Sequence, residues 1–400
     1  MSQASLFVGI DLGNEHHALC IVNDVGKVVL ERTVSNDLTA FEAVRRCMGD
    51  LDPTAVHVAV EDKNNALVDV LLAHGFRVST INPKQVDRFR ERGNVAGAKD
   101  DRRDARVLAM TLRSDGELYR LIDVGSPETV MTRSLSASVD HVTEELRRYS
   151  NHLRAQVLRC FPTLLGLCSG TDEPWFWDLI IELMPVGDVD EKVIAGILKR
   201  HRKRKLTAAA VLSVIRHNRL VPAPGVAEAA TGEVRRLVEK LRLIERQRRE
   251  IVTEREQVLE TMKGSPEKPS DVDIVRSLPG FGPKTTAVFV GAALSLIKRD
   301  GGIAIVRAIA GVAPVTRQSG KTRIVQMRRA CDPRLREALF HAAMAAVRHD
   351  TRFHDHYARL RAASHNHARA LRTIGDRLLG VLDAMLRNRT TYRPMPTAAA

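Results

Sequence analysis

The sequence predicts an α/β domain at its N-terminus and a longer, mostly helical remainder, and three observations lead to this fold class. Short apolar runs alternate with amphipathic segments over residues 6–113, as in a sheet covered by helices. A helix-start signal at residues 126–128 precedes apolar residues at helical spacing. From Val234 onward, core positions recur at alternating intervals of three and four, the pattern of a coiled coil.

The first region opens with a buried strand over residues 6–11 (LFVGID). Residues 18–24 and 27–34 form a predicted hairpin, because the turn-forming residues Asn23-Asp24-Val25-Gly26 separate two apolar runs. The remaining elements are a helix at 38–51, a strand at 55–61, a helix at 66–76, a strand at 77–83 and a helix at 104–112. The order β-β-β-α-β-α-β-α is that of a ribonuclease-H-like, or RuvC-like, sheet.

A long helix is predicted next. Ser126 can cap it, Pro127 suits its first position and Glu128 places an acid in its first turn. Its apolar residues are Val139, Val142, Leu146, Tyr149, Leu153 and Val157. Residues 162–230 show no regular pattern. Their basic run KRHRKRK, at 199–205, reads equally as a phosphate-binding segment and as a solvated helix face.

A heptad pattern follows, which predicts a coiled coil with two arginines at core positions. Its members are Val234, Leu237, Leu241, Ile244, Arg248, Ile251, Arg255, Val258 and Met262. Residues 263–271 (KGSPEKPSD) have the composition of a linker. The predicted domains are therefore residues 1–120, 126–262 and 271–393.

Charge is unevenly distributed along the 400 residues, whose net charge is +14. Residues 1–115 carry 15 Lys/Arg against 17 Asp/Glu, whereas residues 271–400 carry 22 against 9. This asymmetry favours a polyanionic partner, above all nucleic acid, over a merely solvated basic surface. The five cysteines are scattered and include no CxxC pair, which argues against a disulfide framework or a zinc site. With no signal peptide and no apolar run of membrane-spanning length, a cytoplasmic protein without a membrane partner is expected.

Four carboxylates could form a metal site. Asp11 follows the first strand and Glu61 ends the next buried one, so both emerge at one end of the sheet if these strands are neighbours. Asp101 and Asp104, three residues apart on a predicted helix, share a face. Such a set suits two Mg²⁺ ions, which could activate a nucleophile on a phosphodiester. Asp100 with Asp104 would serve the spacing equally well, and a plain N-terminal charge cluster is the alternative.

A different enzyme class also begins this way. The segment VGIDLG (residues 8–13) before a hairpin resembles the first phosphate loop of actin-like ATPases. That fold needs a second glycine-rich phosphate loop and an adenosine motif, and the sequence contains neither.

Two segments of the C-terminal third carry further candidates. Residues 277–294 resemble a helix-hairpin-helix, in which Gly280 and Gly282 expose backbone N–H groups beside Lys284 to a phosphate. A tight turn between packed helices is the alternative. In residues 310–323 (AGVAPVTRQSGKTR), Ser319 precedes Gly320 and reads as a turn residue or as an exposed nucleophile. The histidines between residues 341 and 367 share no metal-ligand spacing.

Several segments in order resemble one family. They are GIDLGNEHHALCIVNDVGKVV, KDDRRDARVLA, LPGFGPKTTA, AGVAPVTRQSGKTR and RLREALFHAAMAAVRHD. Together they resemble the DEDD-type insertion-sequence transposases of the IS110 family, now called bridge-RNA-guided recombinases, which are themselves similar to Piv-type DNA invertases. The resemblance covers nearly the whole chain. It implies a RuvC-like domain, a coiled coil and a C-terminal transposase domain that carries a serine.

The resemblance also implies site residues. The family's four acidic Mg²⁺ ligands fall on Asp11, Glu61, Asp101 and Asp104, because the K-x-D-x-x-D-A motif selects Asp101 rather than Asp100. Its nucleophile falls on Ser319. The neighbouring cations Arg317, Lys321 and Arg323 are expected to hold the scissile phosphate. One departure is RRACDPRLR (328–336), where the family usually has Gly-Asn before R-L-R; this leaves the local loop geometry open.

The resemblance implies dimers and tetramers in which the serine of one subunit can meet the carboxylates of another. It also implies a structured noncoding RNA that pairs with donor and target DNA. The expected function is a bacterial, cytoplasmic DNA recombinase, nucleoid-associated when bound to DNA, that excises and inserts its own mobile element through a phosphoserine. The alternatives are a RuvC-like, junction-cleaving endonuclease that uses water, and a non-enzymatic nucleic-acid scaffold. Four clustered carboxylates disfavour the scaffold, because they weaken binding to a polyanion.

Overall fold

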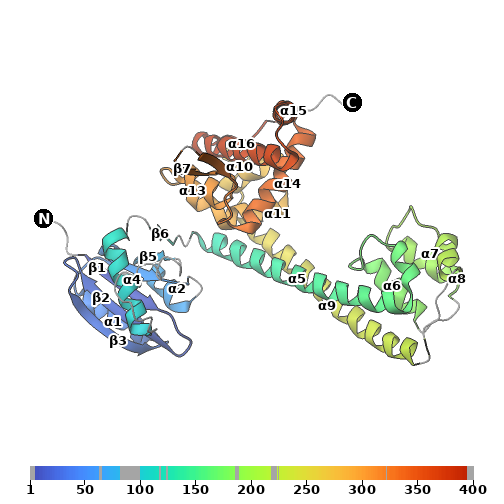
Figure 1. Ribbon diagram of the computed structural model, residues 1–400, viewed down its shortest axis with the longest axis horizontal. Coiled ribbons are helices and arrows are strands. Elements are labelled where there is room, and N and C mark those ends of the chain that lie inside the picture. Colours follow the sequence, from blue (N-terminus) through green and yellow to red (C-terminus); the bar gives the residue numbers. More distant parts are fainter. Residues whose placement is uncertain are drawn as a thin grey trace. The chain divides into compact units, whose positions relative to one another are not determined.

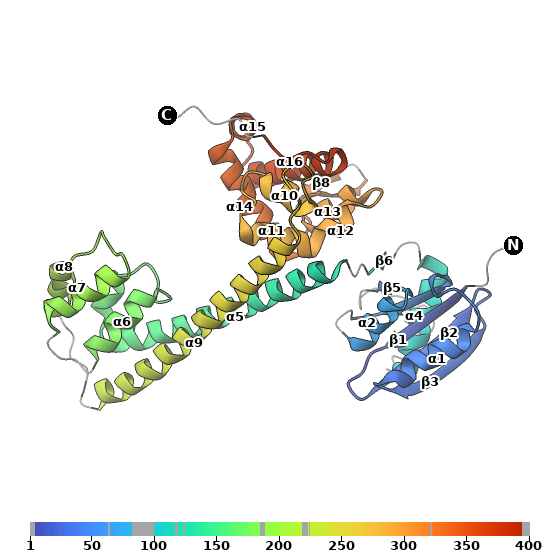
Figure 2. The same cartoon turned by 180° about the vertical axis from the view of Figure 1, so that it is seen from behind.

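The computed structural model describes residues 5–62, 65–81, 100–116, 119–122, 125–184, 189–217, 223, 225–320 and 322–393. The chain divides into two compact units, Met1–Gly125 and Ser126–Ala400 (Figures 1 and 2). Each unit is considered by itself. In the described part of the chain, no helix combines the length and apolar character that crossing a membrane requires.

The first unit contains a six-stranded sheet with the strand order β3-β2-β1-β4-β5-β6. The strands are β1 (Leu6–Asp11), β2 (His16–Asn23), β3 (Val28–Ser35), β4 (Val56–Val60), β5 (Arg77–Thr80) and β6 (Arg120–Leu121). β1 pairs with β2 antiparallel and with β4 parallel. The described elements follow the order that the sequence predicts. The two-residue β6 was not expected, because so short a strand has no periodic signal.

Helices cover both faces of this sheet. Strand side chains alternate between the faces, and those of Val8 and Ile10 pack with α1 (Leu38–Met48) and α2 (Ala66–Ala73). On the other face, Ala59 packs against Leu108 of α4 (Asp101–Asp115). α4 includes both Asp101 and Asp104, as expected, and extends three residues beyond the predicted segment 104–112 at its C-terminal end.

Gly9 lets α4 cross β1 at close range. A Cβ atom at Gly9 would lie 1.9 Å from the carbonyl oxygen of Ala105 and 2.5 Å from the amide nitrogen of Ala109. Both are backbone atoms, so the helix would have to move as a whole. We expect Gly9→Ala to destabilise this unit by about 3 kcal/mol, as overpacking does. Thermal unfolding measures the effect.

Gly116 provides the control, since the nearest atom to a Cβ there lies 3.7 Å away. It ends α4 with φ −56°, which alanine adopts readily. Gly116→Ala should leave the melting temperature unchanged or raise it slightly. Equal melting temperatures for the two variants would mean that Gly9 does not set the distance between helix and sheet.

In the second unit, α5 (Pro127–Cys160) and α9 (Val226–Thr261) pack along each other. Ser126 caps α5 as expected, its Oγ accepting from the backbone N–H of Thr129. The heptad stripe of α9 is buried against α5: Val234, Leu237 and Leu241 share one core with Val142, Leu146, Leu153 and Val157. The apolar seam is therefore filled within one chain. Arg255 lies in it, only 3% exposed.

The described residues between 161 and 225 include four short helices, so the expectation of an irregular region was wrong. They are η3 (Pro162–Gly166), α6 (Pro174–Leu183), α7 (Glu191–Arg200) and α8 (Ala208–Arg216). Their core contains Trp175 and Trp177, both almost fully buried. None of these helices exceeds three turns, which is too short for a clear periodic signal.

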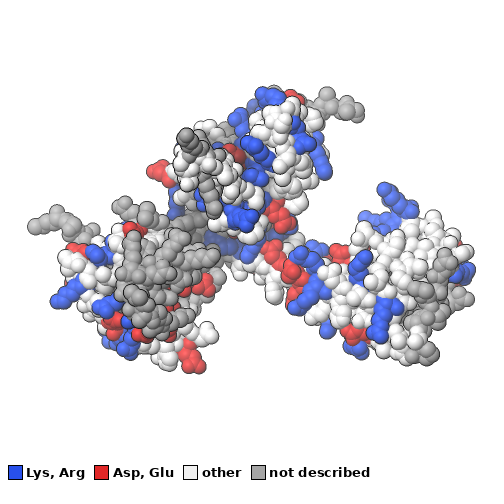
Figure 3. Space-filling view, in the orientation of Figure 1, with Lys and Arg blue, Asp and Glu red and all other residues white. Residues whose placement is uncertain are grey.

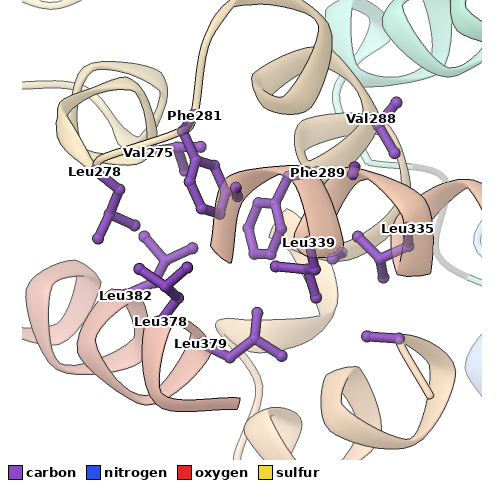
Figure 4. Close-up of a cluster of buried hydrophobic side chains, with 14 of the residues drawn as sticks. Val275, Leu278, Phe281, Val288, Phe289, Leu335, Leu339, Leu378, Leu379 and Leu382 are labelled. Atoms are coloured by element: carbon purple, nitrogen blue, oxygen red, sulfur yellow. The ribbon is translucent and has the colours of Figure 1, made fainter. Parts of the chain in front are cut away.

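The C-terminal part is helical apart from one hairpin. It contains α10 (Asp271–Ser277), α11 (Pro283–Phe289), the π-helical turn η4 (Val290–Leu294), α12 (Ser295–Ile297), α13 (Gly302–Ile309), β7 (Val315–Ser319), β8 (Thr322–Gln326), α14 (Pro333–His349), α15 (Thr351–Ala362) and α16 (His367–Asn388). Figure 4 shows its core, where Phe281 and Phe289 meet edge to face, with ring centroids 5.8 Å apart. Leu339 of α14 and Leu378 of α16 complete this core.

Candidate functional site

Asp11 and Glu61 lie at the same end of the sheet. β1 and β4 are parallel neighbours with Ile10 opposite Val60. Asp11 is the last residue of β1 and Glu61 follows the last residue of β4, so the next positions in register are these two acids. Both residues are half-buried. The two strands are therefore neighbours, which is the condition under which Asp11 and Glu61 emerge at the same end of the sheet.

The N-terminus of α4 lies at this same end. Arg113, near the end of the helix, donates from Nη1 to the carbonyl oxygen of Asp24, 3.2 Å away in the turn between β2 and β3. Arg102, in its first turn, donates from Nε to the hydroxyl of Thr33 over 3.3 Å. Thr33 lies opposite Ala18, which lies opposite Asp11. The helix therefore runs antiparallel to β1 and starts beside the end of that strand.

The structure gives Asp100, Asp101 and Asp104 different positions. Asp100 is the N-cap of α4, and its carboxylate accepts from the backbone N–H of Arg102 over 3.3 Å. Asp104 is only 3% exposed, in line with the buried stripe of the helix. Asp101 lies one turn earlier on that face and is exposed. Spacing could not separate Asp100 from Asp101, and the structure shows that they differ in that Asp100 caps the helix. Lys99, the first residue of the motif, lies outside the described residues.

The donor chemistry at this sheet end suits a hard divalent cation, because all of the candidate ligands are carboxylates. Among the described residues, however, no three histidine, cysteine or acidic side chains are already grouped closely enough to hold a metal ion. The four acids lie on three separate elements, so small side-chain movements would decide whether they converge.

His17 and Asn36 hold the loop that follows Asp11, and the sequence did not single them out. The backbone N–H of Gly13 donates to Nδ1 of His17 over 3.2 Å. Nδ1 is then an acceptor, so Nε2 carries the proton and donates to Oδ1 of Asn36 over 2.9 Å. Asn36 in turn donates to the carbonyl oxygen of Asn14. Burial lowers the pKa of His17 and so favours this neutral form. Strand alternation, which turns His17 inward, was the available signal.

Ser319 is exposed at the tip of the β7–β8 hairpin. It is opposite Thr322, the first residue of β8. Gly320 has φ +54°, and no atom lies within 4 Å of where its Cβ would be. The turn and the exposed serine are thus compatible. Lys321 lies outside the described residues. Strand positions 317 and 319 fall on one face of the hairpin, while position 323 falls on the other.

The helix-hairpin-helix-like segment is only partly open to a ligand. Gly280 has φ +82°, and a Cβ there would lie 2.5 Å from the carbonyl oxygen of Ala342 in α14. Packing therefore requires this glycine, which was the alternative to phosphate binding. Gly282, by contrast, has open space beside it, and Lys284 is exposed and 3.8 Å from Glu337.

The basic run at 199–205 is divided between structural and free cations. Arg200 and His201 contact the carboxylate of Asp178 at 3.2 and 2.8 Å, and Lys203 pairs with Glu173. These contacts hold the end of α7 to α6. Lys199, Arg202, Arg204 and Lys205 are exposed. Figure 3 shows that lysine and arginine side chains also outnumber acidic ones on the visible face of the C-terminal part.

Two family models match the chain. Residues 8–162 match a model of the DEDD transposases of IS110, described as a transposase. Residues 272–358 match a model described as the transposase of the IS116/IS110/IS902 family. The first match includes Asp11, Glu61, Asp101 and Asp104, and the second includes Ser319.

Curated relatives agree with these matches. The chain is 33% identical over 213 residues to the "Putative transposase y4uE" of Sinorhizobium fredii, a match that covers 52% of this chain and 59% of that relative. It is 25% identical to the "Mini-circle putative transposase for IS117" of Streptomyces coelicolor, over 99% of both chains. It is 27% identical to the "Insertion element IS900 uncharacterized 42 kDa protein" of Mycobacterium paratuberculosis, again over 99% of both.

Proposed function

The chain belongs to the IS116/IS110/IS902 family of transposases, and from this premise we propose that it cuts and rejoins DNA through a phosphoserine intermediate, using Ser319 and an acidic quartet. The observation that carries the proposal is the gathering of Asp11, Glu61 and the N-terminus of α4 at one end of the sheet. DNA, as donor and target, is the substrate. Insertion of the element that encodes the protein is the outcome.

Asp11, Glu61, Asp101 and Asp104 would hold divalent cations, Mg²⁺ for preference and two per site, because carboxylate oxygens are the ligands of hard cations. When bound, such ions promote loss of the hydroxyl proton from a nucleophile and stabilise negative charge on the phosphodiester. The half-buried and buried acids would be anchored by their elements, and the exposed Asp101 would be free to adjust.

The covalent step is an exchange of esters. Oγ of Ser319 loses its proton and forms a bond to phosphorus, while the bond from phosphorus to one deoxyribose oxygen breaks. That oxygen takes up a proton and leaves as a hydroxyl. Rejoining reverses the step with the hydroxyl of another strand, so each phosphodiester that is broken is replaced. Ser319 is exposed, and the space beside Gly320 is open, so a bulky DNA strand can reach Oγ.

The proposal also concerns how the acids and the serine are brought together. The acids belong to the first unit of the chain and Ser319 to the second. Catalysis therefore requires the two units to meet, within one chain or between subunits. We propose dimers, and tetramers when two DNA segments are joined, with the serine of one subunit acting beside the carboxylates of another.

We further propose that a structured bridge RNA selects donor and target DNA. The strong positive balance of residues 271–400 and the exposed cations of the run 199–205 support a nucleic-acid partner in addition to the DNA that is cut. The RNA would pair with both DNA segments, and the protein would contact its backbone.

A recombination assay tests this function. We expect protein isolated from a host that carries the complete element to retain one discrete RNA, and to join donor to target DNA in Mg²⁺. Ribonuclease treatment should abolish joining, and adding back the RNA should restore it. Affinity for that RNA should fall steeply with salt, because each neutralised phosphate releases counterions. Full recombination after ribonuclease treatment, with no RNA added, would contradict the guided mechanism.

A further inference from the structure

Arginines cluster at the root of the serine hairpin, away from its tip. The guanidinium of Arg336, on α14, lies against Gly311, four residues before β7. It donates from Nη2 to the carbonyl oxygen of Arg328, two residues after β8. Arg336 therefore touches the chain on both sides of the hairpin.

Arg369 and Arg372, on α16, extend this cluster. Gly375 of α16 packs against Leu339 of α14. Arg372 lies three residues before Gly375, and Arg336 lies three residues before Leu339. Burial, and then the positive charges of Arg336 and Arg369, lower the pKa of Arg372. Arg336 and Arg372 are half-buried, and Arg369 is exposed one turn before Arg372.

The cluster has no counter-charge within the described residues. An arginine that faces the same helix is neutralised: Arg307 lies 2.6 Å from the carboxylate of Asp376 on α16. By contrast, no carboxylate in the described part of the chain is within ion-pair distance of Arg336, Arg369 or Arg372, and the charges that act on Arg372 are those of the other two arginines. Like charges held together in partial burial repel one another, and an anion with several oxygens would offset that repulsion.

The position of the cluster relative to Ser319 is the argument for DNA as the anion. Ser319 lies four residues along β7 from Val315 at the root, a distance of roughly 13 Å at ~3.3 Å per residue. A nucleic-acid strand rises ~3.4 Å per nucleotide, so this distance corresponds to about four nucleotides. A DNA strand attacked at the tip would therefore pass the root within a few nucleotides.

We propose that Arg336, Arg369 and Arg372 bind a backbone phosphate of the cleaved DNA strand, a few nucleotides from the phosphodiester that Ser319 attacks. The inference rests on the proposed function in that it takes Ser319 to be beside the cut. The three guanidiniums recognise backbone and not sequence. They would hold the strand in position along the hairpin while the ester exchange takes place at its tip.

Phosphate-ethylation interference tests the proposal, with end-labelled DNA that carries the element's end. For the wild type, ethylation of a phosphate a few nucleotides from the cut should block binding. Arg372→Gln should lose that interference and retain the others. Its DNA affinity should fall about tenfold, the value of one charge-assisted contact, and its salt slope should fall by about one. Its melting temperature should stay the same or rise, because a like charge is removed.

Arg377→Gln is the matched control, since Arg377 is exposed on the same helix beside His356 of α15. It should keep the wild-type interference pattern. Arg369→Gln, at an exposed position, is a second variant of the cluster and should lose the same interference. An unchanged pattern in both Arg372→Gln and Arg369→Gln overturns the proposal. Weaker binding of RNA with unchanged binding of DNA overturns it as well.

The outcomes also separate this inference from the proposed function. Absence of a covalent adduct at Ser319, together with the predicted loss of interference, would leave the phosphate site standing and remove the phosphoserine. A Ser319 adduct together with an unchanged interference pattern would support the phosphoserine and remove the phosphate site.

Discussion

Replacing Ser319 with alanine is expected to abolish the covalent adduct between protein and DNA. Wild-type protein, mixed with DNA carrying the element's end, Mg²⁺ and guide RNA, should form a complex that resists denaturant and disappears on proteolysis. The variant lacks the only atom that can form the ester, so no adduct should remain. Cleavage should fall on the order of a thousandfold or more, as it does when an enzyme loses its nucleophile. Binding of RNA and DNA should be unchanged, because Ser319 is exposed and its hairpin pairing uses backbone groups.

Thr322 supplies the matched control. It lies directly opposite Ser319, is exposed and also carries a hydroxyl. Thr322→Ala should therefore retain the adduct. Survival of the adduct in Ser319→Ala, or cleavage at the wild-type rate by that variant, would show that Ser319 is only a turn residue. Cleavage without any adduct in the wild type would favour the junction-cleaving endonuclease that uses water.

The second large effect concerns the four acids. Asp104→Ala, and likewise the alanine variants of Asp11, Glu61 and Asp101, should lower DNA cleavage on the order of a thousandfold, because each removes a ligand of a hard cation. A gel assay of cleavage at the element's end measures this loss. Affinity for nucleic acid should persist, and the melting temperature without metal should not fall, since like charges are removed from one end of the sheet. A chelator of divalent cations should abolish DNA cleavage by the wild-type protein.

Asp100→Asn is the control that the structure recommends. Asp100 caps α4, and asparagine is as good an N-cap as aspartate. The variant thus removes a neighbouring negative charge and keeps the start of the helix. It should cleave at close to the wild-type rate. Near-normal strand transfer by Asp104→Ala would falsify the assignment of this acid as a ligand.

Local signals in the sequence predicted much of the fold. The turn at Asn23–Gly26 and the cap at Ser126 lie where the sequence indicated. Both depend on residues within a few positions of one another, so neighbouring side chains determine the backbone there. The positions of Asp11 and Glu61 at the ends of strands were predictable for a similar reason, because each ends a strongly apolar run.

The features that the sequence did not predict depend mostly on contacts between residues far apart in the chain. Gly280 lies against the backbone of Ala342, more than sixty positions later, so packing requires a glycine in a motif that also suggests phosphate binding. The heptad of α9 finds its partner in α5, about a hundred residues earlier. Asp100 and Asp101 are adjacent in sequence, and only the backbone at the start of α4 assigns the cap to one of them. In the first two cases the contact is with a residue far away in the sequence, and in the third the capping residue depends on backbone angles.

The pairing of α5 with α9 has a consequence for insertions and deletions. Each residue of an α-helix advances the chain by ~1.5 Å and turns it by ~100°. Loss of one residue from α9 would therefore rotate Arg255 and Val258 out of the seam that buries them. Loss of seven from both helices would change the rotation by only ~20° and keep the two stripes facing. Changes of length within α5 and α9 should therefore be tolerated only in matched sevens, and a change between the two helices has to spare the core around Trp175 and Trp177.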